Sequence, residues 1–446
     1  MALGGGTFIA QNKVLPGAYM NFVSTAHASA ALSDRGTVTM PLELDWGVED
    51  SIFTVTNEEF QKDTQKIFGY AYADDKMKGL RDLFLNAAVL HAYRLNGGGQ
   101  KASNDYAEAL YSGIRGNDLK IGIQADVDDE TTFEVVTWLG AAKVDSQTVH
   151  DAGELEDNSY VKFKKDAELA AVAASPLTGG TNGTVDGSAY QAYADKAEAY
   201  TYNTMGIATT DDTIKKLFAA FNRRLRDEMG IKFQLVLYDY READYMGVIS
   251  IKNKCMDGAH KDTDGKMVYP EEAAAVFWAT GAEGGCAVNA SCQNKVYNGE
   301  YTLEADFTQS ELVAAIKSGE FVFHKVNSDI RVLDDINTMV TATDDSGEVF
   351  KDNQTIRVID QLGNDDAVIF NTKYLGKVPN DAAGRTALWS DLVKIRKELG
   401  RIHAIEDFND TDVVVSPGDS KKAVVVENVI TVVNAMSKLY MTTTIA

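Results

Sequence analysis

The sequence predicts a multidomain protein of the α+β and α/β classes. We expect a discontinuous α/β middle domain with an inserted small β domain, and a C-terminal α+β domain with extended N- and C-terminal β arms. Three observations predict this. The 446 residues are too many for one ordinary core. Helix-like and strand-like patterns alternate on both sides of a block of short strands. Two helix-like segments followed by strand-like ones form the final part of the chain.

The α/β pattern begins near Gly36. A strand is expected over 36–44 and helices over 57–69 and 76–95, because apolar residues recur at helical spacing in the last of these. The pattern resumes after the β block. There we expect helices over 188–200, 213–230, 270–281 and 310–319, and strands over 231–238, 247–253 and 320–340.

The block between these parts changes to a period of two residues. Residues 113–165 hold short strands split by turns, and a loop over 173–187 leads back to the α/β pattern. A last unit begins near residue 341. Its helices are expected over 355–376 and 385–400, and its strands over 411–419, 421–433 and 437–446.

The chain is strongly acidic. Asp and Glu number 66 against 43 Lys and Arg, which gives a formal net charge of -23. Such a surface repels phosphate backbones, so we expect no nucleic-acid partner. No apolar run of about 18 residues occurs, and the start lacks the features of a secretory signal, so membrane insertion is not expected. Three cysteines suit a reducing compartment.

Motifs for catalysis, cofactors or metals do not emerge. The glycine-rich stretches lack the spacing of nucleotide-binding loops, and residues 126–134 carry Thr131 where a calcium loop needs glycine. Cys286 and Cys292 are spaced poorly for zinc, and the six histidines are scattered. We therefore expect no catalytic residue, cofactor or metal ligand. An enzyme with an α/β catalytic domain and a β accessory domain stays open as the alternative, because absent motifs do not exclude one.

One cluster of positive charge stands out in this acidic chain. The stretch "KIRKELGR" (394–401) packs four cations into eight residues, namely Lys394, Arg396, Lys397 and Arg401. Cations near the C-terminal end of a solvated helix face are common, because they oppose the helix dipole. The other interpretation is an electrostatic contact with an acidic partner.

Both ends of the chain are strand-like. Residues 7–14 alternate, and residues 428–446 are rich in Val, Ile, Thr, Tyr and Met, with Lys438 as their charged side chain. Natural proteins usually protect such edges with charge, proline or a cover. Either the C-terminal strand pairs in its own domain, or it pairs with the sheet of another copy. Head-to-tail pairing of the second kind builds a helical filament or tube.

Several stretches together resemble the contractile phage tail sheath family, in the branch found in defective prophages and phage-tail-like bacteriocins. They follow one another in order along nearly the whole chain. The stretches are "QNKVLPGAYMNF" (11–22), "GTVTMPLELDWG" (36–47), "SPLTGGTNGTV" (175–185), "DVVVSPGD" (412–419) and "VVNAMSKLYMT" (432–442). The first and last are the most specific.

The resemblance implies a structural subunit, not an enzyme, that polymerises helically around a tail tube and contracts to drive the tube through a cell envelope. Its expected partners are other copies of itself, the tail tube protein, and baseplate and tail terminator proteins. It would assemble in the host cytoplasm and reside in a virion tail or phage-tail-like particle. Terminal arms would add strands to neighbouring subunits, and we expect their interface residues to be Phe8, Ala10, Val14, Val429, Val433, Leu439, Met441 and Thr443.

The resemblance also implies a tube contact by a helix of the C-terminal domain. We expect this helix over 385–401, with Lys394, Arg396, Lys397 and Arg401 as the contacts. The expected domains are an N-terminal arm, two parts of the α/β domain around the inserted β domain, and a C-terminal sheath domain with its own arm. The N-terminal arm spans 1–25, and the two parts of the α/β domain span 26–112 and 186–340. The inserted β domain spans 113–185. The C-terminal sheath domain spans 341–446, and its arm spans 421–446.

Overall fold

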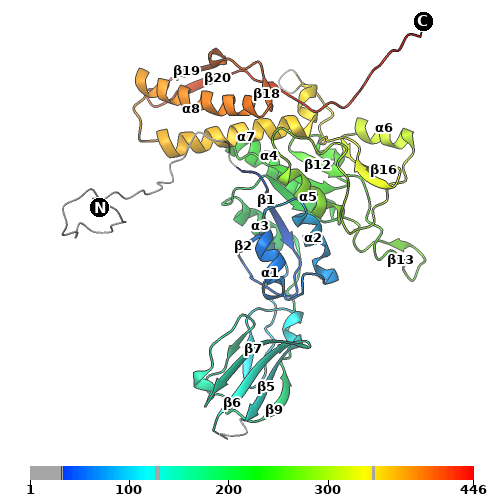
Figure 1. The fold of residues 1–446 in the computed structure, drawn as a ribbon, viewed down its shortest axis with the longest axis vertical. Helices are drawn as coiled ribbons and strands as arrows, with labels where there is room; N and C mark the ends of the chain where they lie inside the picture. The colour runs from blue at the N-terminus through cyan, green and yellow to red at the C-terminus, as the bar shows by residue number, and fades with distance from the viewer. Residues whose placement is uncertain (1–31, 33, 126–130, 344–346, 446) are drawn as a thin grey trace, which may run out of the picture.

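The computed structural model describes residues 32, 34–125, 131–343 and 347–445. It divides into three parts (Figure 1). An α/β body lies in the middle, a β domain projects from one end of it, and a C-terminal domain of two helices and short strands lies across the other end. The multidomain fold class expected from the sequence is confirmed.

A seven-stranded sheet forms the centre of the body. Its strand order is β15-β12-β11-β10-β1-β3-β2, and all neighbours are parallel except β2, which runs antiparallel to β3. The strands span Thr37–Leu42 (β1), Ile52–Thr56 (β2), Val89–Arg94 (β3), Thr204–Ile207 (β10), Gln234–Tyr238 (β11), Val248–Ile251 (β12) and Glu320–Phe321 (β15). Most neighbouring strands are parallel, so the chain must cross over the sheet to join them, and several of these connections are helices.

Helices cover the two faces of this sheet. One core joins alternate strand residues such as Val38 and Ile249 to one set of helices, and a second core joins residues such as Met205 to the other set. The first set comprises α1 (Asn57–Phe68), α2 (Lys78–Phe84) and α5 (Ala275–Gly285), and the second comprises α3 (Gly187–Ala197) and α4 (Asp212–Arg224). Helix α5 is buried on almost all sides, which explains its apolar sequence.

The helix expected over 76–95 is wrong in its second half. The chain forms α2 and then turns into β3, a strand that pairs with both β1 and β2. A strand inside a parallel sheet is apolar on both faces, so its residues also fit helical spacing. His91 consequently lies on β3, where its Nδ1 is 2.9 Å from Thr54 Oγ1.

The β domain has its own core. A four-stranded antiparallel sheet in the order β7-β6-β5-β9 packs with the pair β4-β8. The strands span Ala107–Ala109 (β4), Leu119–Ala125 (β5), Phe133–Leu139 (β6), Ala142–Val149 (β7), Val161–Phe163 (β8) and Val172–Pro176 (β9). Ala107 and Ala109 are fully buried here, although we expected them in the first part of the α/β domain. In Figure 1 this domain lies at the end of the molecule farthest from the C-terminal domain.

Smaller elements flank the body beyond β12. They are two hairpins and a short helix: β13 (His260–Lys261) with β14 (Met267–Val268), β16 (Phe323–Val326) with β17 (Asp329–Val332), and α6 (Gln309–Lys317). None of the helices in the described ranges is long and apolar enough to cross a membrane.

The C-terminal domain is built on two long helices. Apolar residues of both, including Val358, Leu362, Leu392 and Leu399, form one core with the strands that follow. The elements are α7 (Asn353–Ile369), α8 (Ala382–Arg401), β18 (Ile405–Glu406), β19 (Val413–Pro417), β20 (Val424–Asn428) and β21 (Thr431–Val432). Strands β19 and β20 form a hairpin, and β18 pairs with β21. Residues 437–445, expected as a strand, form none within this chain.

Candidate subunit-assembly surface

The first part of the C-terminal arm pairs within its own domain. Strand β20 pairs with β19, and β21 pairs with β18. The Val429 N–H donates to the Asp412 carbonyl at 3.0 Å, and the Val433 N–H donates to the Ala404 carbonyl at 3.0 Å. The backbone N–H groups of Val429 and Val433, both expected interface residues, are therefore hydrogen-bonded within their own domain. The Val429 side chain is nevertheless exposed.

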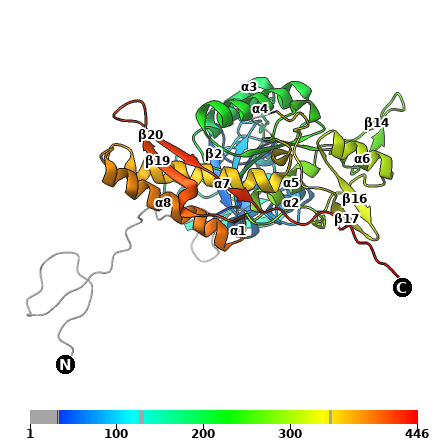
Figure 2. The ribbon, with the colours of Figure 1, turned by 90° about the horizontal axis from the view of Figure 1, so that it is seen from above.

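The arm then leaves the domain. Toward its end the chain runs away from the body, as Figures 1 and 2 show from two directions, and Met436 is fully exposed. Leu439 is 85% exposed and Met441 is 78% exposed, and Tyr440 and Ile445 are exposed as well. Thr443 is also exposed. Apolar side chains in such a row, without cover from their own domain, are typical of a segment that binds a partner. Phe8, Ala10 and Val14 lie outside the described residues.

The strands of the C-terminal domain have unpaired edges. Within the described ranges β19 pairs with β20 alone, and β18 pairs with β21 alone. The hairpin also exposes the large side chains of Val414, Val425 and Val426. An unpaired edge presents a row of N–H and C=O groups that can accept a further strand. The C-terminal domain thus offers both a projecting extended segment and edges suited to receive one.

Arg396 corrects one expectation about the cation cluster. Its side chain is 2% exposed. The guanidinium binds both carboxylate oxygens of Asp366 on α7, at 2.5 and 2.6 Å, and its Nε donates to Asn428 Oδ1 at 3.3 Å. Arg396 therefore connects α8 to α7 and β20. It is not available to contact a partner, and we withdraw it from the expected tube contact.

The other three cations of α8 are exposed. Lys394, Lys397 and Arg401 each keep more than half of the side chain accessible. Each also has a carboxylate of its own within ion-pair distance, namely Asp391, Asp410 and Glu398. Exposed pairs of this kind are weak and exchange partners readily. These three residues lie on one helix, and the neighbouring carboxylates neutralise part of their positive charge.

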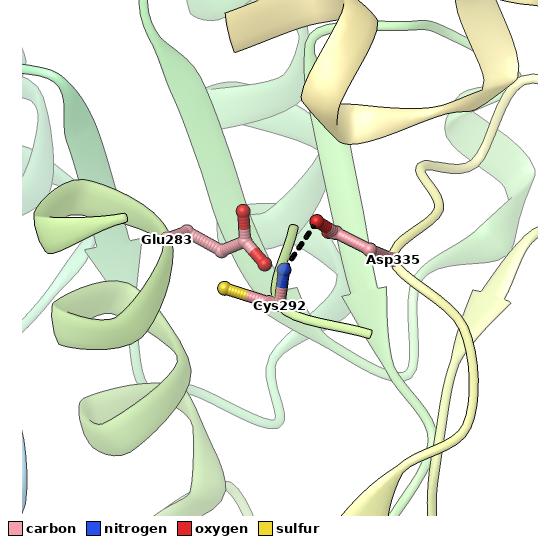
Figure 3. Close-up of side chains that lie close together, drawn as sticks. All are labelled: Glu283, Cys292 and Asp335. Carbon is pink, nitrogen blue, oxygen red and sulfur yellow. Dashed lines mark hydrogen bonds between the residues drawn. The ribbon is translucent and has the colours of Figure 1, made fainter. Parts of the chain in front are cut away.

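A buried cluster of ionisable groups joins the body to α7. Figure 3 shows Glu283, Cys292 and Asp335 converging from α5, the loop after it and the segment after β17. The Arg357 guanidinium on α7 binds Glu283 Oε2 at 2.8 Å and Asp335 Oδ2 at 3.0 Å. Asp335 Oδ2 also accepts the N–H of Cys292 at 2.8 Å. The cluster is an ion-pair network that positions α7.

This cluster is closed to solvent. Glu283, Cys292, Asp335 and Arg357 are all at most 1% exposed, so a substrate could not reach them. Burial and the neighbouring Asp335 raise the pKa of Glu283, against the influence of Arg357. The competing class, an enzyme, calls for ionisable groups that converge in an accessible pocket. The converging groups here serve packing between domains.

A second buried ion pair lies along the same helix. Arg226, just after α4, binds both oxygens of Asp360 on α7 at 2.6 and 2.7 Å. Arg357 and Asp360 are three residues apart and therefore share one helix face. We did not predict a role for Arg357 or Asp360 from the sequence. Their spacing of three residues could have indicated a polar face on α7.

Four family models match consecutive parts of the chain. They describe a phage tail sheath protein central domain (residues 183–338), a phage tail sheath C-terminal domain (345–446), a phage tail sheath protein beta-sandwich domain (97–182) and the Gp18 tail sheath protein domain III N-terminal region (35–95).

Relatives cover the full length. The phage-like element PBSX protein XkdK of Bacillus subtilis is 30% identical over 98% of this chain and 99% of its own. The solved sheath tail protein of Desulfitobacterium hafniense is 35% identical, with a TM-score of 0.80 over 95% of this chain and 99% of that one. The anti-feeding prophage helical sheath in its contracted state is similar in fold, with 12% identity, coverage of 97% and 99%, and a TM-score of 0.56. This chain therefore belongs to the contractile phage tail sheath protein family.

Proposed function

We propose that this protein is the subunit of a helical sleeve around a tail tube, that neighbouring subunits exchange terminal β-strands, and that contraction of the sleeve drives the tube through a cell envelope. One observation carries the strand exchange. The apolar segment 436–445 projects from a domain whose own strands have unpaired edges. Two complementary features on different parts of one domain suit a head-to-tail contact, which propagates into a helix instead of closing.

The energetics favour a connected mesh over isolated pairs. An added strand of about eight residues gains several backbone hydrogen bonds at a net ~1 kcal/mol each, before the cost of ordering the strand. One such link is weak. When each subunit donates and accepts two arms, later links form at high effective concentration, and the lattice becomes firm. Covered apolar residues such as Leu439 and Met441 add to each link.

Contraction needs no nucleotide in this proposal. The extended lattice is metastable, and rigid-body rotation of domains leads to a shorter lattice of lower free energy. The fold similarity to a contracted sheath supports this reading. Arms that stay paired keep the subunits connected while the domain bodies turn. The particle is a virion tail or phage-tail-like particle, assembled in the host cytoplasm with baseplate and terminator proteins as further partners.

The tube contact is placed on α8. Because Arg396 is bound to Asp366, we propose that Lys394, Lys397 and Arg401 face an acidic surface of the tube protein. Because their own carboxylates are close, the contact requires that the cations exchange partners during docking.

Electron microscopy of the purified protein tests the assembly. The full chain is expected to form sleeves or rings, and a variant lacking 436–445 is expected to remain a folded monomer, because its links to neighbours are lost. A second variant carries a glycine-serine segment of the same length in place of 436–445. It tests whether the apolar side chains, and not only the length of the segment, are needed for assembly. Sleeves formed by either variant would disprove the exchange through this segment.

Co-sedimentation with tube protein tests the α8 contact. Reversal of the three charges (Lys394→Glu, Lys397→Glu, Arg401→Glu) is expected to abolish binding to the tube while sleeve formation without tube persists. The matched control reverses three exposed lysines of the β domain, Lys101, Lys162 and Lys165. Equal binding by the two triple variants would remove α8 from the tube interface.

A further inference from the structure

The first turn of α7 holds the chain where the projecting segment begins. Gln354 Nε2 donates to the Val433 carbonyl at 3.0 Å, and Gln354 Oε1 accepts the Ala435 N–H at 2.9 Å. Beside it, Asn434 Nδ2 donates to Thr355 Oγ1 at 3.0 Å. Gln354 and Thr355 are 2% and 1% exposed. Two buried side chains are thus bound to three consecutive residues of the arm.

The Gln354 carboxamide takes the place of a peptide group. In a parallel ladder, the N–H and C=O of one residue bind the C=O and N–H on either side of its partner. Gln354 makes this same pair of bonds around Asn434, because a carboxamide carries both a donor and an acceptor. The β-like pairing that begins at β21 therefore continues to Ala435 without another strand.

This contact marks a boundary in the arm. On its near side, the Val433 N–H is bonded to the Ala404 carbonyl. On its far side, the described part of the arm makes no hydrogen bond with the domains, and Met436 is fully exposed. Lys438 contributes only a charge effect, since it lowers the pKa of Asp334, which burial raises. The segment free for exchange thus starts immediately after the Gln354 contact.

The contact also connects the arm to the body. Helix α7 is fixed to the body by Arg357, bound to Glu283 and Asp335, and by Asp360, bound to Arg226. A pull on the arm is therefore transmitted through Gln354 to this anchored helix. Without it, the load would act on β21, which is held to β18 by only two residue pairs.

We propose that Gln354 and Thr355 form an arm clamp, which sets the point where the exchanged segment leaves the subunit and transfers its load to the α/β body. The inference rests on the proposed strand exchange. Both residues are positioning residues: they act on the arm of their own subunit and contact no neighbour.

Hydrogen exchange at single-residue resolution on the purified subunit tests the clamp. Gln354→Met keeps the side-chain size and removes both hydrogen bonds. The Ala435 amide is expected to exchange about tenfold faster, because it loses its acceptor. The Val433 amide, whose acceptor is the Ala404 carbonyl, is expected to stay protected. Unchanged exchange at Ala435 would overturn the clamp.

Two further variants keep the test sharp. Gln361→Met replaces another buried glutamine of α7 and is expected to leave Ala435 unchanged. Asn434→Ala removes the bond to Thr355 from the exposed side, without touching the core, and is expected to speed Ala435 exchange about threefold. If Asn434→Ala increased the exchange rates of the Val433 and Ala435 amides equally, the contact with α7 would not be distinct from the pairing of β21 with β18, and the inference would fail.

The two proposals fail in different ways. If strand exchange is wrong, the chain lacking 436–445 still forms sleeves, while the effect of Gln354→Met on Ala435 exchange persists. If the clamp is wrong, the truncated chain loses sleeves, while Ala435 exchange does not respond to Gln354→Met.

Discussion

Helix α7 and the segment 436–445 reverse the usual distribution of polar and apolar groups. Helix α7 buries charged side chains, with Arg357 and Asp360 almost inaccessible to solvent. The terminal segment does the opposite and exposes Leu439, Tyr440 and Met441. Most soluble domains bury apolar groups and expose charges. One region is therefore an interface formed inside the subunit, and the other is the interface that the proposed assembly would form with another subunit.

The difference lies in what each interface must do. A buried ion pair adds little net stability over a well-packed apolar pair, but it is costly to disrupt. The bonds of Arg357 and Asp360 are directional, so they fix one arrangement of α7 on the body. Apolar contact is less directional and follows the area covered. In the proposed contraction, an apolar arm would therefore stay attached while the surface that receives it rotates.

The largest expected effect comes from leaving charges of the formed interface unpaired. Arg357→Met is expected to lower the free energy of unfolding by about 3–5 kcal/mol, because Glu283 and Asp335 stay buried without their cation. Urea denaturation followed by circular dichroism measures the loss. Arg401→Met, which removes an exposed pair, is the control and should cost less than about 1 kcal/mol. A similar loss of unfolding free energy in the two variants would contradict the difference that we expect between the buried and the exposed ion pairs.

A smaller effect is expected at the start of α7. Burial and the nearby Asp335 raise the pKa of Asp352 from 3.8 to about 6. The folded state therefore binds more protons between these values, and stability falls as the pH rises through that window. Asp352→Asn keeps an acceptor for the Thr355 N–H and removes the charge. It should be about 1 kcal/mol more stable than the parent at pH 8, allowing for partial exposure, and equal to it at pH 4.

Denaturation of both proteins at the two pH values gives this difference directly. A stability difference that does not change between pH 4 and pH 8 would mean that Asp352 does not titrate in the folded state as its surroundings imply.

The smallest effect is expected in the arm. Leu439→Ser should change the stability of the isolated subunit by less than about 0.5 kcal/mol, because this side chain makes few contacts at home. Thermal unfolding measures this, with Leu399→Ser in the core of the C-terminal domain as the destabilised comparison. A large loss from Leu439→Ser would show that the arm packs on its own subunit in solution.

Long amphipathic elements were predictable from the sequence. Helices α1, α4 and α8 lie where apolar residues recur at helical spacing. The buried strands were not all predictable. β3 fits a helix equally well, and β10 has four residues, one of them Gly206. A Cβ at Gly206 would lie 2.1 Å from Thr280 Oγ1 on α5, so close helix packing and not strand preference explains this residue.

The candidate surface was predictable in part. Composition alone singles out the exposed apolar segment, because it lacks charge where a free edge needs it. Arg396 was misplaced because its neighbours in sequence are exposed cations. It shares the buried face of α8 with Leu392 and Leu399, and that spacing could have identified it. Glu283, one of the two partners of Arg357, lies 74 positions away, and Arg226, the partner of Asp360, lies 134 positions away, distances over which local pattern carries no information.

The polar joint at α7 has one more consequence. At this joint, guanidinium, carboxylate and carboxamide groups of α7 bind groups of the body, and water can satisfy these groups on either side when the two parts are separate. These hydrated groups add no apolar surface that other chains could bind. During biosynthesis, the last hundred or so residues can accordingly fold around the core shared by α7 and α8 before these polar groups bind the body.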